Sequence, residues 1–157
     1  MKRHPSLAPL SRDHHGALLL SRLLQKGAPV YKGLPENNLD KLVYAKSFYV
    51  KELVPHFKKE EAAMQVVKGT TADIDKIISE IFSEHSELSN LFDGLHEDNF
   101  TVEQLDILGK KLEAHVRKEE RILFPMIQEN CSVKVLDEIG QLFITDINKK
   151  IKILINS

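Results

Sequence analysis

The chain has 157 residues, 42% of them hydrophobic and 29% charged, which suits one soluble domain of ordinary size with a substantial core. Its 22 Lys and Arg residues almost balance its 23 Asp and Glu residues, so the net charge of −1 gives no electrostatic basis for binding nucleic acid or an anionic membrane. No apolar run is long enough to span a bilayer, and the single cysteine excludes an intramolecular disulfide, so we expect a cytoplasmic protein.

The first helix is expected over residues 6–26, where apolar and small side chains repeat on one face. His14 falls on that face, whereas the adjacent His15 points about 100° away. Seven residues further along, His14 is followed by Ser21 and His15 by the charged Arg22. We therefore favour His14 as the inward residue.

The second helix is expected over residues 39–67 and carries His56 on its apolar stripe. Pro55 lacks an N–H group, so we expect a kink at that point. The third helix, residues 72–93, has an unbroken apolar repeat with steps of four and three residues. His85 is the polar member of that repeat and is therefore also expected to point inward.

The fourth helix opens at Thr101 with a capping-box sequence, and its inward face includes His115. Gly109, in the middle of this helix, predicts the close approach of a neighbouring helix, and Pro125 should kink or end it. A fifth, shorter amphipathic helix is expected at residues 132–153. It either caps the end of the bundle or forms a dimer interface.

The chain contains one short sequence repeat: the segment from His56 to Glu61 recurs, with conservative changes, from His115 to Glu120. In each copy the glutamate four residues after the histidine, Glu60 or Glu119, shares its helical face. Both copies therefore direct an imidazole and a carboxylate into a core, where unpaired polar groups are costly. A metal site would satisfy both copies at once.

Four amphipathic helices with short connections predict an all-α, up-down-up-down four-helix bundle at residues 6–130, within a single domain over residues 1–157. Counted from the connecting loops at 1.5 Å per residue, the inward histidines lie ~20 to ~27 Å along their helices. These distances differ by about one turn, which helix tilt absorbs. We therefore expect one polar layer formed by His14, His56, Glu60, His85, His115 and Glu119.

The residue types in this layer favour a pair of metal ions. Imidazole binds Fe, Zn, Cu and Ni, and carboxylates add oxygen donors. Six side chains are too many for one tetrahedral zinc ion but suit two ions about 3.5–4 Å apart, bridged by the glutamates. Of about twelve positions on two octahedral ions, the side chains and a bridging oxygen fill all but two. Water or a small ligand could take these, so the site is expected to be reactive.

Single histidines on the first and third helices, combined with His-x-x-x-Glu-Glu on the second and fourth, resemble the hemerythrin-like (HHE cation-binding) family. The resemblance covers residues 7–130 and includes Arg12-Asp13-His14, Glu84-His85 and the Ile-Leu-Phe-Pro sequence that ends at Pro125. It implies a non-haem di-iron centre with an oxo or hydroxo bridge, for which zinc or manganese could substitute. The ligands that it implies are His14, His56, Glu60, His85, His115 and Glu119.

The chain departs from the oxygen-carrying members of this family in one respect. They have a further histidine one turn before the ligand on the third helix, where this chain has Ile81. The missing ligand argues against simple oxygen carriage and favours iron oxidation, sensing or scavenging. In those relatives the carboxylate of the fourth helix is at the position of Glu120, but we favour Glu119, which matches Glu60. Glu120 and Glu61 are expected to be outer groups.

The leading hypothesis is a small cytoplasmic di-iron protein that binds or senses dioxygen, nitric oxide, peroxide or iron. The first alternative is an enzyme, either a di-metal oxidase, a peroxidase-like protein or an iron-repair protein, although no dedicated acid or base stands out beyond the six residues. The second is a metal-free structural bundle, at a heavy desolvation cost for its buried charges. The expected partners are a diatomic or peroxide ligand, with a homodimer left open, and neither nucleic acid nor a membrane.

Overall fold

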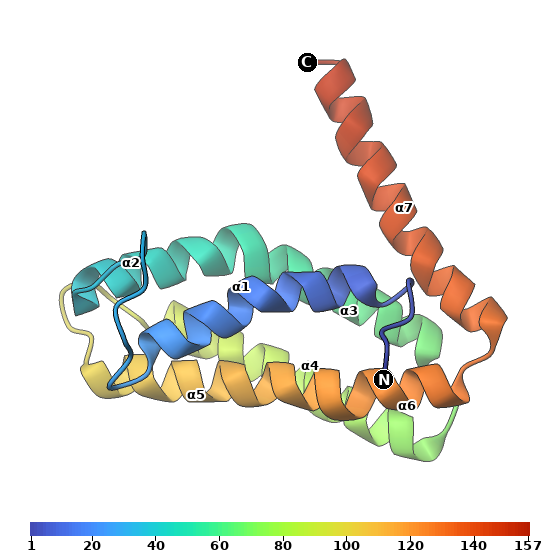
Figure 1. Cartoon of the computed structure of the whole chain (residues 1–157), viewed down its shortest axis with the longest axis horizontal. Helices are drawn as coiled ribbons and strands as arrows, with labels where there is room; N and C mark the ends of the chain where they lie inside the picture. Colours follow the sequence, from blue (N-terminus) through green and yellow to red (C-terminus); the bar gives the residue numbers. More distant parts are fainter.

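The computed structural model describes the backbone of residues 1–157 and every side chain except those of Thr145 and Asp146. The described chain consists of helices and loops without a strand, which confirms the all-α expectation (Figure 1). None of the described helices combines the length and apolarity needed to cross a membrane. In chain order the helices are α1 (Ala8–Leu24), α2 (Asn38–Phe48), η1 (Tyr49–Leu53), α3 (Val54–Val67), α4 (Ala72–Asp93), α5 (Val102–Lys118), η2 (Glu119–Leu123), α6 (Phe124–Asn130) and α7 (Val133–Ile155).

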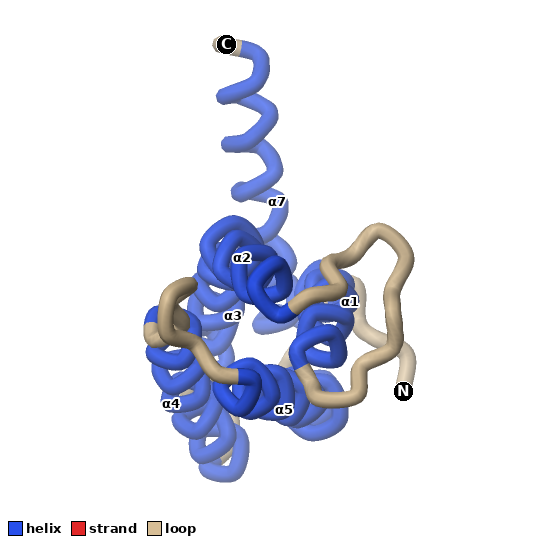
Figure 2. Tube along the Cα trace, turned by 90° about the vertical axis from the view of Figure 1, so that its left-hand side faces the viewer, coloured by secondary structure: helices blue, strands red, loops and turns tan.

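Four long rods form the bundle. The segments α2, η1 and α3 follow one another without a break, as do α5, η2 and α6, and α1 and α4 are the other two rods. Seen from the end of the bundle, the four rods surround a common core (Figure 2). The chain reverses direction at each connecting loop (Figure 1), so the predicted up-down-up-down topology is confirmed.

The two prolines do not end their rods, and each is preceded by five residues of wider π-helix. Proline has no N–H group and its ring crowds the preceding turn, so a wider turn accommodates it without breaking the rod. Pro125 therefore does not end its helix, which continues to Asn130. In both rods the residue before the proline donates its N–H to the carbonyl five residues earlier, Val54 to Tyr49 and Phe124 to Glu119.

Gly109 lies at a close approach of α1 and α5. A Cβ atom at this position would lie 2.5 Å from the carbonyl oxygen of Ser21 and 3.1 Å from side-chain atoms of Leu24 and Gln25. Only a residue without a side chain therefore fits between the two helices. The predicted close approach at this glycine is confirmed.

The core consists of two apolar clusters with the predicted polar layer between them. On α1, for example, Leu10 belongs to one cluster and Ala17 to the other, and His14 lies between them. On α4, Ile81 and Leu88 flank His85 in the same way. Each rod thus passes from one apolar cluster to the other through the polar layer, which is enclosed on both sides.

The last helix, α7, covers Val133–Ile155, close to the predicted bounds of 132–153. We expected a short helix, but it has 23 residues, because no glycine or proline interrupts its apolar pattern after Gly140. Its first half packs on the bundle, where Leu136, Ile139 and Phe143 are buried. The second half leaves the bundle and extends away from it (Figure 1).

Candidate metal centre

The structure brings all six predicted side chains together in one buried layer. None of them is more than 4% exposed, and both glutamates are 0% exposed. Each rod contributes at least one residue, because the helical repeat that buries its apolar neighbours also turns the polar residue inward. The six residues are His14 from α1, His56 and Glu60 from α3, His85 from α4, His115 from α5 and Glu119 at the start of η2.

The six side chains form two groups that share the same two carboxylates. The first group combines His14 and His56 with Glu60 and Glu119. The second combines His85 and His115 with these same glutamates. Within each group the potential ligand atoms lie within 4.8 Å of one another. This arrangement suits two cations, each held by two imidazoles, with both carboxylates between them.

In each ring the Nε2 atom is the one that faces a central carboxylate. The shortest separations between an Nε2 atom and a central carboxylate oxygen are 2.9 Å for His14 and His56, 3.1 Å for His115 and 3.3 Å for His85. His14 and His56 cross edge to face with ring centroids 4.9 Å apart, and so do His85 and His115. The two halves of the layer therefore repeat each other closely.

The atoms that face the middle of the layer lie at ion-pair distance from one another but do not form hydrogen bonds of good geometry. All four Nε2 atoms and all four oxygens of Glu60 and Glu119 are buried and have no hydrogen-bond partner among the residues that the structure describes. Buried polar atoms are normally paired, and an uncompensated buried charge costs several kcal/mol. Nitrogen and oxygen donors that converge without partners are what a pair of bound metal ions would satisfy, so the residues fit such a group.

Outer carboxylates orient three of the four rings. The Nδ1 atom of His14 lies 2.7 Å from Glu120, that of His56 lies 3.0 Å from Asp13, and that of His115 lies 2.8 Å from Glu84. A carboxylate can only accept here, so it holds a proton on Nδ1 and leaves the lone pair of Nε2 directed at the centre. Such partners fix the ring and increase its basicity as a ligand.

Sequence reasoning identified Glu120 as an outer group but missed Asp13 and Glu84. Each of these two directly precedes a buried histidine, in Asp13-His14 and Glu84-His85, but bonds to the histidine of the next rod. One residue along a helix corresponds to a rotation of about 100°, which turns the acid from the core toward the adjacent helix. An acidic residue directly before an inward histidine was therefore a sequence signal that could have identified both outer carboxylates.

His85 differs from the other three histidines. Its Nδ1 atom is 3.9 Å from Glu61 and has no hydrogen bond among the described residues. The ring stacks instead on Phe57, with centroids 4.1 Å apart and planes at 16°. A surface hollow of about 340 Å³, lined in part by His85, Glu61, Phe57 and Ser86, lies on this side of the layer. His85 therefore lines a hollow that opens at the surface.

The metal-free layer has strongly shifted proton affinities. Burial lowers the pKa of His14, but the surrounding carboxylates, above all that of Glu119, outweigh burial and raise the pKa to about 12. In His115 and His56 the same opposition between burial and the nearest central glutamate raises the pKa to about 10 and about 9. Burial raises the pKa of Glu60, but the facing imidazoles reverse this and lower it well below its ordinary value. Without metal, protonated imidazoles therefore neutralise the negative charge of the two central carboxylates.

The remaining candidates lie outside the layer. His15 and His96 are exposed, so the ring of the adjacent pair that reaches the core is that of His14. Glu119 is buried at the centre, whereas Glu120 bonds to the outer nitrogen of His14 and is 25% exposed at its side chain. Ile81 is fully buried and provides no donor atom one turn before His85.

Comparison with known families agrees with this geometry. The model of the hemerythrin HHE cation-binding domain matches residues 7–127, which include the first three rods, the fourth rod up to the middle of α6, and all six central residues. Comparisons with curated proteins and with solved structures gave no match. The matched segment is most of the chain, and it ends before α7 begins. The chain therefore belongs to the hemerythrin family of HHE cation-binding domains.

Proposed function

We propose that this protein holds two iron ions in the polar layer and uses them to bind or sense a small ligand. His14 and His56 would hold one ion and His85 and His115 the other, and both ions would share the central glutamates. The observation that carries the proposal is the set of buried Nε2 and carboxylate atoms without hydrogen-bond partners among the described residues. Family membership supports a cation at this place.

A bound pair of iron ions would supply redox chemistry and open positions for a diatomic or peroxide ligand. The residues of this chain have three tasks around it. Glu60 and Glu119 neutralise positive charge at the centre. The outer carboxylates, such as Asp13 at His56, hold a proton on Nδ1 so that Nε2 can donate its lone pair. The apolar clusters on both sides keep bulk water away.

The side chain of Ile81 favours sensing or scavenging over simple oxygen carriage. It is fully buried in one apolar cluster one turn before His85, so the third rod, α4, offers one histidine to the second ion and not two. An ion with fewer protein ligands has more positions for an external molecule. We propose dioxygen, nitric oxide or peroxide as that molecule.

Metal analysis of protein purified in air from iron-replete cells tests the proposal. We expect about two iron ions per chain, together with near-ultraviolet absorption that changes when nitric oxide or peroxide is added. His85→Ala should lose at least one ion, and His15→Ala is the matched control because its ring is exposed. Fewer than one metal ion per chain, or zinc alone, would contradict the proposal.

Two further measurements separate the alternatives. A metal-free structural bundle should keep its melting temperature after exhaustive chelation, whereas a metal-linked bundle should lose stability. An enzyme should turn over peroxide or nitric oxide many times per chain and lose that turnover in His56→Ala without unfolding. Binding with a single spectral change and no turnover would support a sensor.

A further inference from the structure

The second half of α7 exposes an apolar surface that its own bundle does not cover. Six aliphatic side chains in this half are between 48% and 76% exposed: Ile144, Ile147, Ile151, Ile153, Leu154 and Ile155. Isolated helices shorter than about 12 residues are marginal in water, and apolar groups concentrated on a protruding helix usually mark an interaction site. The surface therefore needs a partner.

Most of these side chains form one stripe with the spacing of a helix-to-helix seam. Gly140, Ile144, Ile147, Ile151 and Leu154 follow one another in steps of four, three, four and three residues. That repeat of 3.5 residues is the pattern by which two helices pack along their length. The stripe begins on the part of α7 that packs on the bundle and continues beyond it, whereas Ile153 lies on the opposite side of the helix.

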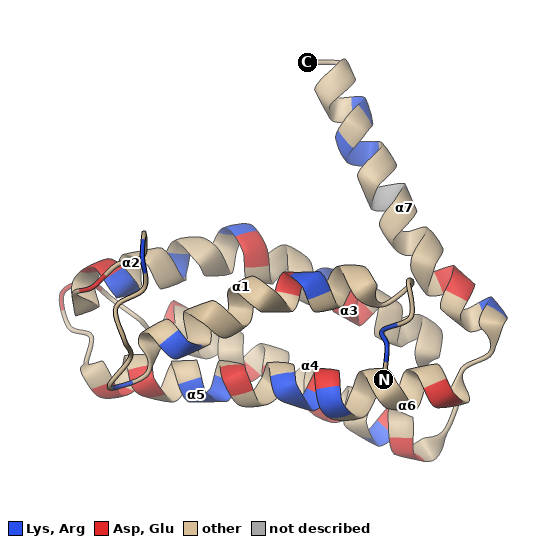
Figure 3. Ribbon diagram, in the orientation of Figure 1, with Lys and Arg blue, Asp and Glu red and all other residues tan. Residues whose placement is uncertain are grey.

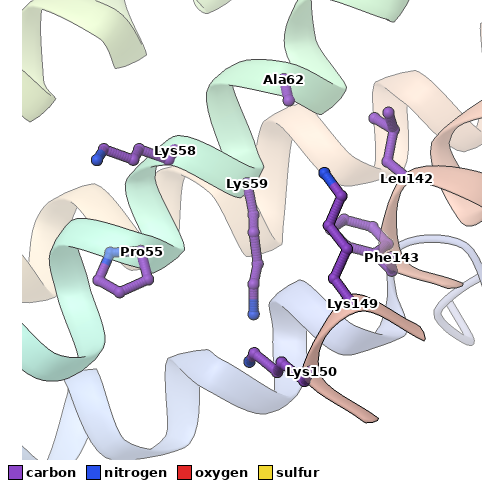
Figure 4. A pocket seen from close by; sticks show the side chains of 8 residues that line it. All are labelled: Pro55, Lys58, Lys59, Ala62, Leu142, Phe143, Lys149 and Lys150. Carbon is purple, nitrogen blue, oxygen red and sulfur yellow. The ribbon is translucent and has the colours of Figure 1, made fainter. Parts of the chain in front are cut away.

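The bundle cannot cover the protruding half, because like charges face each other where α7 leaves α3. A wedge of about 420 Å³ between the two helices is lined by Pro55, Ala62, Leu142, Phe143 and four lysines, Lys58, Lys59, Lys149 and Lys150 (Figure 4). Folding α7 down onto α3 would bring these lysines closer together, which Coulomb repulsion opposes. The covering surface must come from outside this chain.

We propose that the stripe pairs with the same stripe of a second copy of this chain, with the two α7 helices antiparallel. The charges along α7 favour this partner and this direction. In the sequence its first half carries Lys134, Asp137 and Glu138, a net charge of −1, and its second half carries Asp146, Lys149, Lys150 and Lys152, a net charge of +2. Figure 3 shows acidic residues near the start of the helix and basic residues towards its end. Antiparallel pairing places each basic half beside an acidic half, whereas parallel pairing would stack lysines on lysines. A twofold axis makes the contact self-complementary.

A groove beside α7 offers the rest of the interface. It has a volume of about 380 Å³ and is lined by the N-terminal residues Pro5 and Pro9 together with Leu136, Gly140 and Ile144 of the helix. The free half of α7 alone is about 18 Å long and 10 Å wide, which is small beside the roughly 800 Å² that each partner buries in a specific dimer. The end of the second copy's helix therefore has to enter this groove.

The spacing fixes which residues meet. With the twofold axis between Ile144 and Ile147, each of these faces the other in the second copy, and Gly140 faces Ile151. A glycine at that point leaves room for a large side chain, and an added Cβ would meet only atoms of Ser6, at 3.7 Å and 4.0 Å. The interface and the metal layer lie in different parts of the molecule, so the dimer does not depend on the proposed function.

Mass measurement of the full chain by light scattering, over a range of concentrations, tests the dimer. We expect a dimer for the wild type and a monomer for Ile151→Glu, because a charge in the seam has to be buried without a partner. Ile153→Glu is the matched control: it is 67% exposed on the same turn but lies off the stripe, and it should remain dimeric. All three proteins should bind the same amount of metal. A monomeric wild type, or equal loss in both variants, overturns the proposal.

Disulfide trapping in a Cys131→Ser background tests the direction. Chains that carry Gly140→Cys should crosslink to chains that carry Ile151→Cys, and neither variant should crosslink to itself. Crosslinking of each variant with itself would indicate a parallel pair and overturn the antiparallel arrangement. Sedimentation with vesicles of phosphatidylcholine and phosphatidylglycerol tests the other class of partner. A monomer that binds these vesicles through Ile151 would show that the stripe faces a lipid surface and not a second copy.

Discussion

Asp13 on α1 accepts a hydrogen bond from the Nδ1 atom of His56 on α3, at 3.0 Å, so the orientation of a central imidazole depends on a neighbouring rod. Lys59 lies 3.9 Å from the same carboxylate. Glu84 has the equivalent role for His115, and Lys118 is 2.7 Å from its other oxygen. Burial raises the pKa of Glu84, but its bonds to His115 and Lys118 reverse this and lower it.

Removing an outer carboxylate should weaken metal binding without unfolding the bundle. Glu84→Gln leaves a neutral group beside His115, and we expect a loss of metal affinity of about 10- to 100-fold, measured by competition with a chelator. Glu87→Gln, one turn further along α4 and on the surface, is the matched control. Equal affinities in the two variants would show that Glu84 does not orient the ring.

Substitution of the adjacent residues Glu119 and Glu120 should have different effects on metal content. Glu119→Gln removes a fully buried carboxylate shared by both histidine groups, so we expect loss of at least one metal ion per chain. Glu120, the outer partner of His14, also pairs with Arg3, and Glu120→Gln should keep both ions at reduced affinity. Metal content per folded chain distinguishes the two. The reverse result would assign the central role to Glu120.

The metal-free protein should be more stable at pH 6 than at pH 9. Folding raises the pKa of His56 to about 9 and that of His115 to about 10, so their contribution is fully present below the unfolded value of about 6.5 and is lost as pH rises through the folded values. The lowered pKa of Glu60 acts in the opposite direction, and its contribution is lost only in acid.

Metal should reverse this trend, because ions compete with protons for the same Nε2 atoms and bind more tightly as pH rises. Melting temperatures of chelated and metal-loaded protein at the two pH values provide the measurement. We expect the stabilisation by metal to grow from pH 6 to pH 9. A chelated protein that is equally stable at both values would contradict the proton-balanced layer.

Gly109→Ala should destabilise the bundle by about 1–3 kcal/mol, because the added methyl group would overlap the carbonyl oxygen of Ser21 at 2.5 Å. The better helix propensity of alanine offsets only part of this cost. Gly140→Ala is the control, since its methyl group would meet nothing closer than 3.7 Å within the chain. Both variants are compared in the Ile151→Glu background, in which the proposed dimer does not contribute. Urea denaturation gives both values, and equal stability of the two variants would show that α1 and α5 can move apart freely.

Local patterns were sufficient to predict the four rods and the six central side chains. A helix repeats every 3.6 residues, so the spacing of apolar residues around His85, or of His115 and Glu119, already determines which side chains share the buried face. Rise per residue then predicts that these faces meet at one level. His14 could be chosen over His15 for the same reason, and the structure buries the first and exposes the second.

Other features depend on contacts between rods, which spacing along one helix does not encode. The hydrogen bond from His56 to Asp13 arises from how two neighbouring helices sit against each other. The path of α7 also depends on contacts between helices. Its apolar stripe was visible in the sequence, but only the bundle, with lysines on α3 facing Lys149 and Lys150, decides that half of this helix stands free.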